Sequence, residues 1–318
     1  RPGSKAWPAV RRTISERPFG ICMSSSIGAW LRRHRFGVAL CSLMGALLLL
    51  AGPLVWRHHE LMRHLLHPDR QLISAQAQAD ARRRLPGLES VAFRSADGVT
   101  LQGWYLPSRN RAAVVLVHGA AENRLWLLDE AESLARLGFG VLLYDNRAAG
   151  ESGGDLQTWG DREQEDVIGA LDFLQQRPDV DPGRLGAEGF SIGASTVALA
   201  AARDQRVRAV VLKAVWTGLS EELVHMLGGG WQARWALHDF ARAGVRLEQV
   251  NPLARIASLA PRPVMVVVGD RDHHVPLAVA RAVFEAAGQP RTWRVIPDAD
   301  HVDYERLGGD PLRAEVGA

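Results

Sequence analysis

The sequence predicts an α/β fold in which helices cover both faces of a mostly parallel, eight-stranded sheet. Three observations lead to this prediction. Short apolar runs alternate with segments of helical periodicity, the runs are rich in β-branched residues, and several of them end in Gly or Asp. Strands that alternate with helices need crossover connections, which make neighbouring strands parallel and bury the sheet on both sides.

The eight expected strands are short runs that lie between residues 91 and 298. The first two flank the turn "ADG" at 96–98, which predicts an antiparallel hairpin. The strands are expected, in order, at VAFRS (91–95), TLQGWYLP (100–107), AAVVLVHG (112–119), GFGVLLYD (138–145), RLGAEGF (184–190), VRAVVLKA (207–214), RPVMVVVGD (262–270) and RTWRVIPD (291–298).

Helical patterns fill the intervals between these strands, near 123–137, at 161–176 and at 191–203. After the sixth strand the alternation stops for about 45 residues, at about 215–260, where two short amphipathic helical patterns occur. An insertion of this size predicts a small helical cap. Its tryptophans are candidate substrate contacts, and a helical excursion that buries its own tryptophans is the alternative; they are Trp216, Trp231 and Trp235.

The charge of the chain is unevenly distributed. The chain has a net charge of +3, but residues 1–56 hold eight Lys/Arg and one Glu, so they carry +7 and the remainder carries −4. The main body therefore has no basic surface of the kind that binds nucleic acid. Both cysteines, Cys22 and Cys41, precede the body, which excludes a disulfide or a thiolate metal site there.

A run of twenty uncharged residues, "GVALCSLMGALLLLAGPLVW" at 37–56, predicts a transmembrane signal anchor. At 1.5 Å per residue this run is about as long as a hydrocarbon core of roughly 30 Å. A cleaved signal peptide and a buried helix are the alternatives, but no A-x-A site closely follows the run. The expected organisation is a basic tail at 1–36, the anchor, a juxtamembrane helix and linker at 57–84, and the α/β domain at 85–318.

The juxtamembrane segment "RHHELMRHLLHPD", at 57–69, has four histidines and an apolar helical stripe. The stripe favours an interfacial helix that ends before Pro68 over a metal cluster. Three arginines lie close to each end of the apolar run, so the local charge is even. The basic first 22 residues favour a cytoplasmic N-terminus.

Ser191 lies in the pattern G-x-S-x-G, which it forms with Gly189 and Gly193. It falls between a strand and the helix at 191–203, where a tight strand–turn–helix makes glycines necessary two residues before and after the serine. The helix N-terminus also favours negative charge that develops beside the hydroxyl. Ser191 is therefore the predicted nucleophile.

A serine nucleophile needs a base, and the base needs an acid that orients it. Two acids, Asp270 and Asp272, follow the strand at 262–270. Asp270 comes directly after the strand and is expected to close the turn. Asp272 lies further into the loop, from which a side chain reaches across the sheet edge, so it is the predicted acid.

Four histidines are candidates for the base. His273 and His274 adjoin Asp272, and a neighbour on the same loop tends to point away from the serine. His118 belongs to the opposite loop and is expected to be structural. His301 follows the last strand and completes the order Ser, Asp, His, so it is the predicted base. Backbone N–H groups of Ala120 and Ile192 are the predicted oxyanion donors.

Residues 88–305 resemble the serine-dependent α/β-hydrolase superfamily, particularly its membrane-anchored and bacterial branch. The motifs that carry the resemblance are "DGVTLQGWYLP", "VLVHGAAENR", "YDNRAAGESGG", "EQEDVIGALDFL", "DPGRLGAEGFSIGAS" and "GDRDHHVP". The resemblance implies an α/β-hydrolase fold and the same roles for Ser191, Asp272, His301 and the two oxyanion donors. Ala121 is a further candidate substrate contact. The sequence departs from the family pattern at Ala148, where a glycine is usual, and in "DADH" before the histidine.

We therefore expect a membrane-tethered serine hydrolase that cleaves carboxylic ester or thioester bonds in a small-molecule or lipid-like acyl substrate, without a cofactor or metal. A serine peptidase of the same fold and a catalytically silent membrane-anchored binding protein are the alternatives. The expected location is a bacterial inner membrane, crossed once, with the catalytic domain outside the cytoplasm. No nucleic-acid partner is expected, and the sequence leaves the oligomeric state open.

Overall fold

The computed structural model describes residues 30, 33–304 and 306–309. The chain divides into two compact units at Arg57 and His58. The described part of the first unit is mostly helix α2 (Arg35–Leu66), which continues into the second unit and contains Pro53. The helix is long and apolar enough to cross a membrane, and its most apolar stretch is not buried within the protein.

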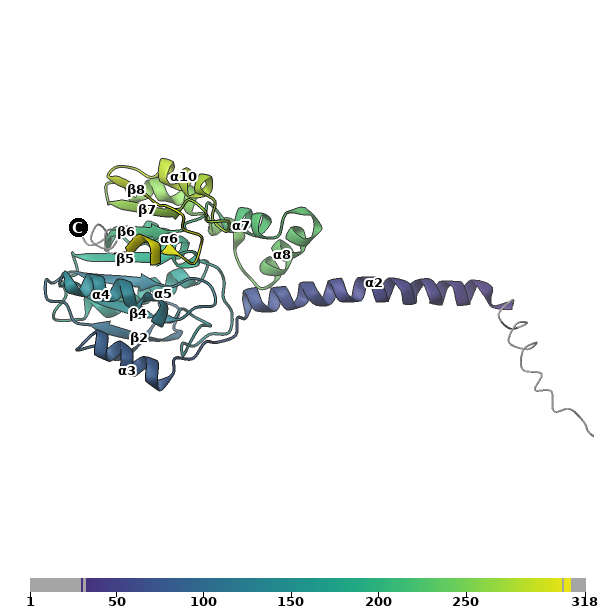
Figure 1. The fold of residues 1–318 in the computed structure, drawn as a ribbon, viewed down its shortest axis with the longest axis horizontal. Coiled ribbons are helices and arrows are strands. Elements are labelled where there is room, and N and C mark those ends of the chain that lie inside the picture. Colours follow the sequence, from purple (N-terminus) through teal and green to yellow (C-terminus); the bar gives the residue numbers. More distant parts are fainter. Residues whose placement is uncertain (1–29, 31–32, 305, 310–318) are drawn as a thin grey trace, which may run out of the picture. The chain divides into compact units, whose positions relative to one another are not determined.

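The second unit is built on one eight-stranded sheet with the order β1-β2-β4-β3-β5-β6-β7-β8, which confirms the predicted fold class (Figure 1). Antiparallel pairing is confined to the β1–β2 and β2–β4 contacts, and the other neighbours are parallel. The strands are β1 Glu89–Arg94, β2 Thr100–Leu106, β3 Ala113–Val117, β4 Gly140–Tyr144, β5 Leu185–Phe190, β6 Val207–Lys213, β7 Val264–Gly269 and β8 Arg291–Ile296.

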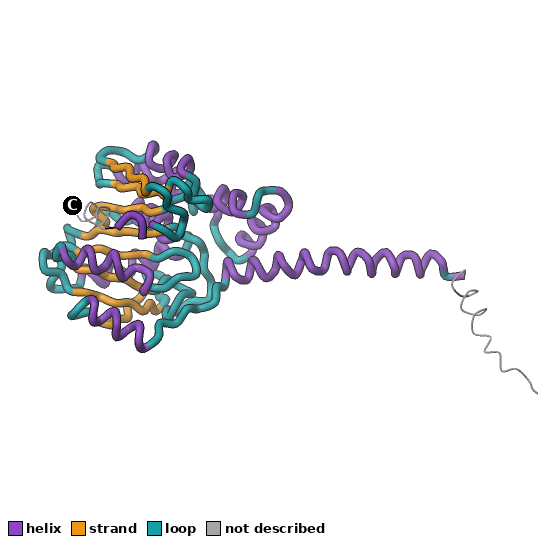
Figure 2. Tube along the Cα trace, in the orientation of Figure 1, coloured by secondary structure: helices purple, strands orange, loops and turns teal. Residues whose placement is uncertain are grey.

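Helices cover both faces of this sheet, as Figure 2 shows. All five residues of β4 are buried, and its side chains alternate between two apolar clusters. Leu142 and Tyr144 pack in the cluster shared with α5 and α6, whereas Val141 and Leu143 pack in the cluster shared with α3 and α4. The helices are α3 Ala75–Arg84, α4 Leu128–Arg136, α5 Glu163–Gln175, α6 Ile192–Arg203 and α10 Leu277–Ala286, with a 3₁₀ turn, η1, at Arg124–Leu127.

The segment after the apolar run differs from the interfacial helix that its sequence predicts. Met62 and Leu66 are buried in the core of the second unit, and Leu61 and Leu65 pack against that core. The apolar stripe therefore serves the domain, because burial against the core removes it from water as effectively as a membrane surface would. Residues 75–84 form α3, which is capped by Ser74, where a linker was expected.

The predicted cap is present as short helices between β6 and β7. Helices α7 and α8 pack on each other, and Phe240 of α8 is fully buried. The elements of the cap are α7 Leu219–Met226, α8 Gly230–Arg242, η2 Leu247–Gln249, α9 Pro252–Arg255 and η3 Ile256–Leu259.

Candidate active site

Ser191 occupies the joint between β5 and α6 with φ 54° and ψ −117°. A non-glycine residue at positive φ of this kind costs on the order of 1–3 kcal/mol and persists where the surroundings enforce it. The Ser191 N–H donates to the carbonyl of Lys213 at the end of β6 over 2.8 Å. The turn is thus held by the neighbouring strand, and it presents the Ser191 hydroxyl at the N-terminus of α6.

The two glycines of the motif are required by close backbone contacts. A Cβ on Gly189 would lie 2.3 Å from the carbonyl group of Gly193, and a Cβ on Gly193 would lie 2.2 Å from the carbonyl oxygen of Val117. Both distances are well inside van der Waals contact. The strand, the turn and the helix therefore approach as closely as they do only because neither position carries a side chain.

His301 lies between the serine and an acid. Its Nδ1 is 2.8 Å from Asp272 Oδ2, and its Nε2 is 3.1 Å from Ser191 Oγ. An ionised carboxylate only accepts hydrogen bonds, so Nδ1–H donates to Asp272 and leaves Nε2 free to accept from the serine hydroxyl. This tautomer is the one that a general base for Ser191 requires.

Asp272 is buried, and four donors surround its carboxylate. Oδ1 accepts the backbone N–H groups of His274 and Val275 at 2.9 and 2.7 Å. Oδ2 accepts from His301 and from the Tyr304 hydroxyl, each at 2.8 Å. Burial alone would raise the pKa of Asp272, but its hydrogen bonds and the charge of His301 outweigh burial, so the pKa is lowered. Asp272 is therefore ionised while it accepts the hydrogen bond from the imidazole.

The predicted oxyanion donors lie on two elements beside the serine. Ile192 is the first residue of α6, so its N–H is outside the i→i−4 ladder of that helix. Ala120 lies in the loop after β3, where Glu122 Oε2 accepts the N–H of Gly119 at 2.7 Å. Burial raises the pKa of Glu122, and the Gly119 N–H and His301 oppose that rise.

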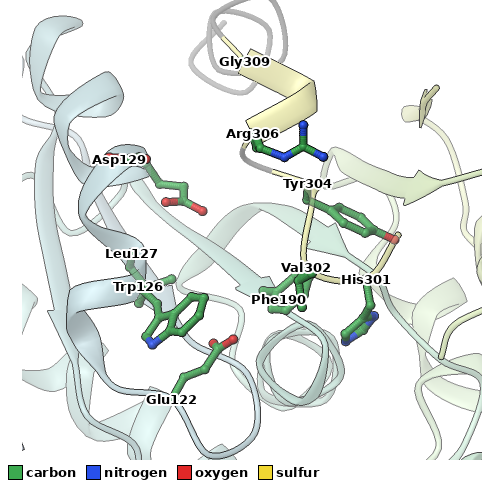
Figure 3. A pocket seen from close by; sticks show the side chains of 11 residues that line it. Glu122, Trp126, Leu127, Asp129, Phe190, His301, Val302, Tyr304, Arg306 and Gly309 are labelled. Atoms are coloured by element: carbon green, nitrogen blue, oxygen red, sulfur yellow. The ribbon is translucent and has the colours of Figure 1, made fainter. Parts of the chain in front are cut away.

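A cavity of about 600 Å³ opens beside His301. In Figure 3, Glu122 and Trp126 lie on one side of it, and Phe190, His301 and Tyr304 lie on the other. The Phe190 ring is 4.9 Å from the imidazole of His301, between ring centres. The cavity is large enough for a substrate group next to His301, and its wall combines aromatic rings with carboxyl groups.

The cap tryptophans lie elsewhere. Trp216 is buried in the core, and Trp231 and Trp235 are exposed on α8, where their rings stack edge to face. None of the three is among the described residues that line the cavity. Trp235 also contacts the ring of His58, whose Nε2 lies 2.9 Å from Asp239 Oδ2. The cap aromatic side chains therefore meet the end of α2 in the second unit.

The other residues considered in the sequence occupy distinct places. Asp270 Oδ1 accepts the N–H of Asp298 and so links the loops after β7 and β8. His118 is fully buried, with Nδ1 bonded to the Gly119 carbonyl and Nε2 accepting from the Asn146 N–H, and burial lowers its pKa. Ala121 is at φ 53°, and Ala148 is at φ 61°, which is the conformation that glycine would adopt without strain.

Three residues of the site were not predicted: Tyr304, Phe190 and Glu122. Tyr304 lies three residues after His301. In a turn or helix this spacing brings two side chains close together, so the sequence could have indicated that Tyr304 lies near His301. Phe190 directly precedes Ser191. Among the described residues, no group of three or more His, Cys, Asp or Glu side chains is arranged to hold a metal ion.

The fold and this site together define a serine hydrolase of the α/β-hydrolase fold. The chain belongs to the prolyl oligopeptidase family, whose model matches residues 126–313, more than half of the sequence.

Two relatives are similar to this chain in sequence, and a solved structure shares its fold. An uncharacterised protein of Mycobacterium tuberculosis is 32% identical over 228 residues, which cover 71% of this chain and 76% of the relative. A polyketide transferase of Stachybotrys chlorohalonatus is 38% identical over 269 residues, which cover 68% of this chain and 90% of the relative. The structure of the Pyrococcus furiosus esterase Pf2001 matches with a TM-score of 0.65 and 23% identity, and the match covers 80% of this chain and 96% of the esterase.

Proposed function

We propose that this protein is a membrane-tethered serine hydrolase that cleaves carboxylic ester or thioester bonds through Ser191, His301 and Asp272. The observation that carries the proposal is the position of His301, within hydrogen-bond distance of both Ser191 Oγ and Asp272 Oδ2. A serine that contacts a histidine, which in turn contacts an orienting carboxylate, can be activated as a nucleophile.

In the first half of the reaction, Ser191 Oγ attacks the acyl carbonyl carbon while His301 Nε2 takes the hydroxyl proton. The N–H groups of Ala120 and Ile192 donate to the oxyanion, and two such donors typically contribute several kcal/mol. The bond to the leaving group then breaks, His301 returns the proton to that group, and the acyl-enzyme remains. Asp272 holds the imidazole and stabilises its protonated form throughout.

In the second half, a water molecule attacks the acyl carbon and gives a proton to His301. Collapse of the second tetrahedral intermediate releases the carboxylic acid, and the proton returns to Ser191. The four donors around Asp272 already orient its carboxylate, so the acid does not need to move during this cycle.

Acyl chemistry is supported by two of the similar proteins, one called an esterase and one called a polyketide transferase. The aromatic wall of the cavity beside His301 suits an acyl or alcohol group with apolar surface. Tethering is supported by the apolar stretch of α2, which we propose crosses a bacterial inner membrane once with the catalytic domain outside the cytoplasm.

A p-nitrophenyl ester series of increasing acyl length tests the reaction, with a p-nitroanilide peptide series and Ser191→Ala as controls. Ester hydrolysis by the wild type, with background rates for the variant, is the expected result. Hydrolysis of the anilides but not of the esters would contradict the proposed ester specificity and indicate that the protein cleaves amide bonds. Separation of the membrane fraction with carbonate tests tethering, and release of the protein into the soluble fraction would contradict it.

A further inference from the structure

The residues between α2 and α3, 67–74, form a strap that runs across two loops of the second unit. The Arg70 guanidinium donates to backbone carbonyls in the loop after β4, those of Gly150, Ser152 and Gly154. His67 Nδ1 contacts the carbonyl of Asp155 in the same region. The strap therefore attaches the chain that follows the apolar helix to the catalytic domain by its polar groups.

Gln71 connects the strap to the oxyanion loop, residues 119–123, in two ways. Its side-chain Nε2 donates to the carbonyl of Ala121 over 2.7 Å. Its backbone carbonyl accepts from Asn123 Nδ2 over 2.8 Å. Asn123 in turn accepts the Leu125 N–H at 2.9 Å and so begins η1. One residue of the strap thus contacts the oxyanion loop on both sides of Glu122.

The oxyanion loop adopts a conformation that needs such support. Ala121 is at φ 53°, a region that alanine seldom occupies. The peptide that carries the Ala120 N–H lies between two held points. On one side Glu122 Oε2 accepts the Gly119 N–H, and on the other Gln71 donates to the Ala121 carbonyl. The carbonyl of this same peptide, that of Gly119, accepts from His118 Nδ1 at 2.8 Å, so loss of the Gln71 contact would leave only the Ala121 side of the peptide unsupported.

We propose that Gln71 is a positioning residue for the oxyanion hole, which acts through Ala121 on the direction of the Ala120 N–H. This inference rests on the proposed function, in which that N–H stabilises the oxyanion. An oxyanion donor contributes most in the transition state, so its misdirection lowers kcat more than it raises KM. The residue that follows the apolar helix by five positions is thereby part of the catalytic geometry.

The test compares Gln71→Glu with Gln78→Glu in the full chain. The first substitution keeps the size of the side chain but replaces the amide donor by an acceptor that faces the Ala121 carbonyl. Gln78 of α3 is the matched control, because its Nε2 also donates to a backbone carbonyl over 3.4 Å, but to that of Ile73 within the strap and not to the oxyanion loop. Steady-state kinetics with a p-nitrophenyl ester and the thermal midpoint are measured for both.

We expect Gln71→Glu to lower kcat by about three- to tenfold with KM within about twofold of the wild type. Gln78→Glu should retain the wild-type kcat, and both variants should keep the wild-type thermal midpoint. A wild-type kcat in Gln71→Glu, a loss confined to KM, or an equal loss in Gln78→Glu would overturn the inference. If Ser191→Ala is inactive in the same assay, such a result leaves the proposed function standing. If Ser191→Ala hydrolyses the ester like the wild type, both fail together.

Discussion

Tyr304 donates a hydrogen bond to Asp272 Oδ2, the oxygen that also faces His301 Nδ1. Both contacts measure 2.8 Å, and the two side chains that share the oxygen come from one short segment of the chain. The hydroxyl therefore helps to hold Oδ2 in the position where it accepts the imidazole N–H. Asp272 and Tyr304 are both buried, so water does not replace this donor.

Removal of that hydroxyl is expected to reduce turnover. Tyr304→Phe should lower kcat about tenfold with little change in KM, because a buried carboxylate loses one of its four donors and its pKa rises. Tyr105→Phe is the control, since Tyr105 also donates to a carboxylate, that of Asp179 at 2.5 Å, outside the active site. Equal kinetics in Tyr304→Phe and the wild type would show that the hydroxyl does not support Asp272.

Glu222 of α7 should make stability depend on pH. Burial raises its pKa to about 7 from an ordinary value of 4.5, although the charges of His225 and His301 oppose the rise. The folded protein therefore binds this proton more tightly than the unfolded chain does. The stability that this group contributes is complete below pH 4.5 and is lost as the pH rises through about 7.

Glu222→Gln removes the titration, so its free energy of unfolding should fall less than that of the wild type between about pH 5 and pH 8. The difference is at most about 3 kcal/mol, from 1.36 kcal/mol for each unit of pKa. Urea unfolding of the detergent-solubilised protein measures it. Glu221→Gln, on the exposed side of α7, is the control and should follow the wild type. Parallel pH curves for Glu222→Gln and the wild type would contradict the assignment.

Two glycines of β5 should respond differently to alanine. Gly189→Ala should destabilise the protein by about 3 kcal/mol or more and abolish activity, because its Cβ would overlap the backbone of Gly193. Gly186→Ala, on the same strand, meets its nearest neighbours at 3.6 Å and should be tolerated. Chemical denaturation of both variants measures the contrast, and similar midpoints would argue against the close packing of strand and helix.

The sheet was predictable from the sequence because buried parallel strands leave an unusually direct signal. β4 and β7 are continuous apolar runs. Seven of the eight strands fall within their predicted runs, and β1 begins two residues before its run. Helices α3 and α10 were not among the predicted elements. Only Ala81 of α3 is buried. Because so few positions of this helix need an apolar side chain, its sequence of alanine, glutamine, aspartate and arginine has little apolar periodicity and resembles a linker.

The site was only partly predictable. Ser191, Asp272 and His301 follow strands directly or by a short loop, and that order places them at one edge of the sheet. The cavity depends on contacts that the order of elements does not specify, because its walls come from the loop after β3, the end of β5 and the segment after β8. The cap tryptophans were predicted as substrate contacts because of their aromatic side chains, whereas Trp216 packs in the core.

The central claim is that Ser191 is the nucleophile, and covalent labelling with a fluorophosphonate tests it most directly. The reagent loses fluoride when a serine oxygen activated by a base attacks phosphorus, so the mass of the protein rises by one phosphonyl group. We expect one label on the wild type and on Ser195→Ala, whose serine is buried one turn further into α6, and no label on Ser191→Ala. An unlabelled wild type with ester hydrolysis, or equal labelling of Ser191→Ala, would contradict the account.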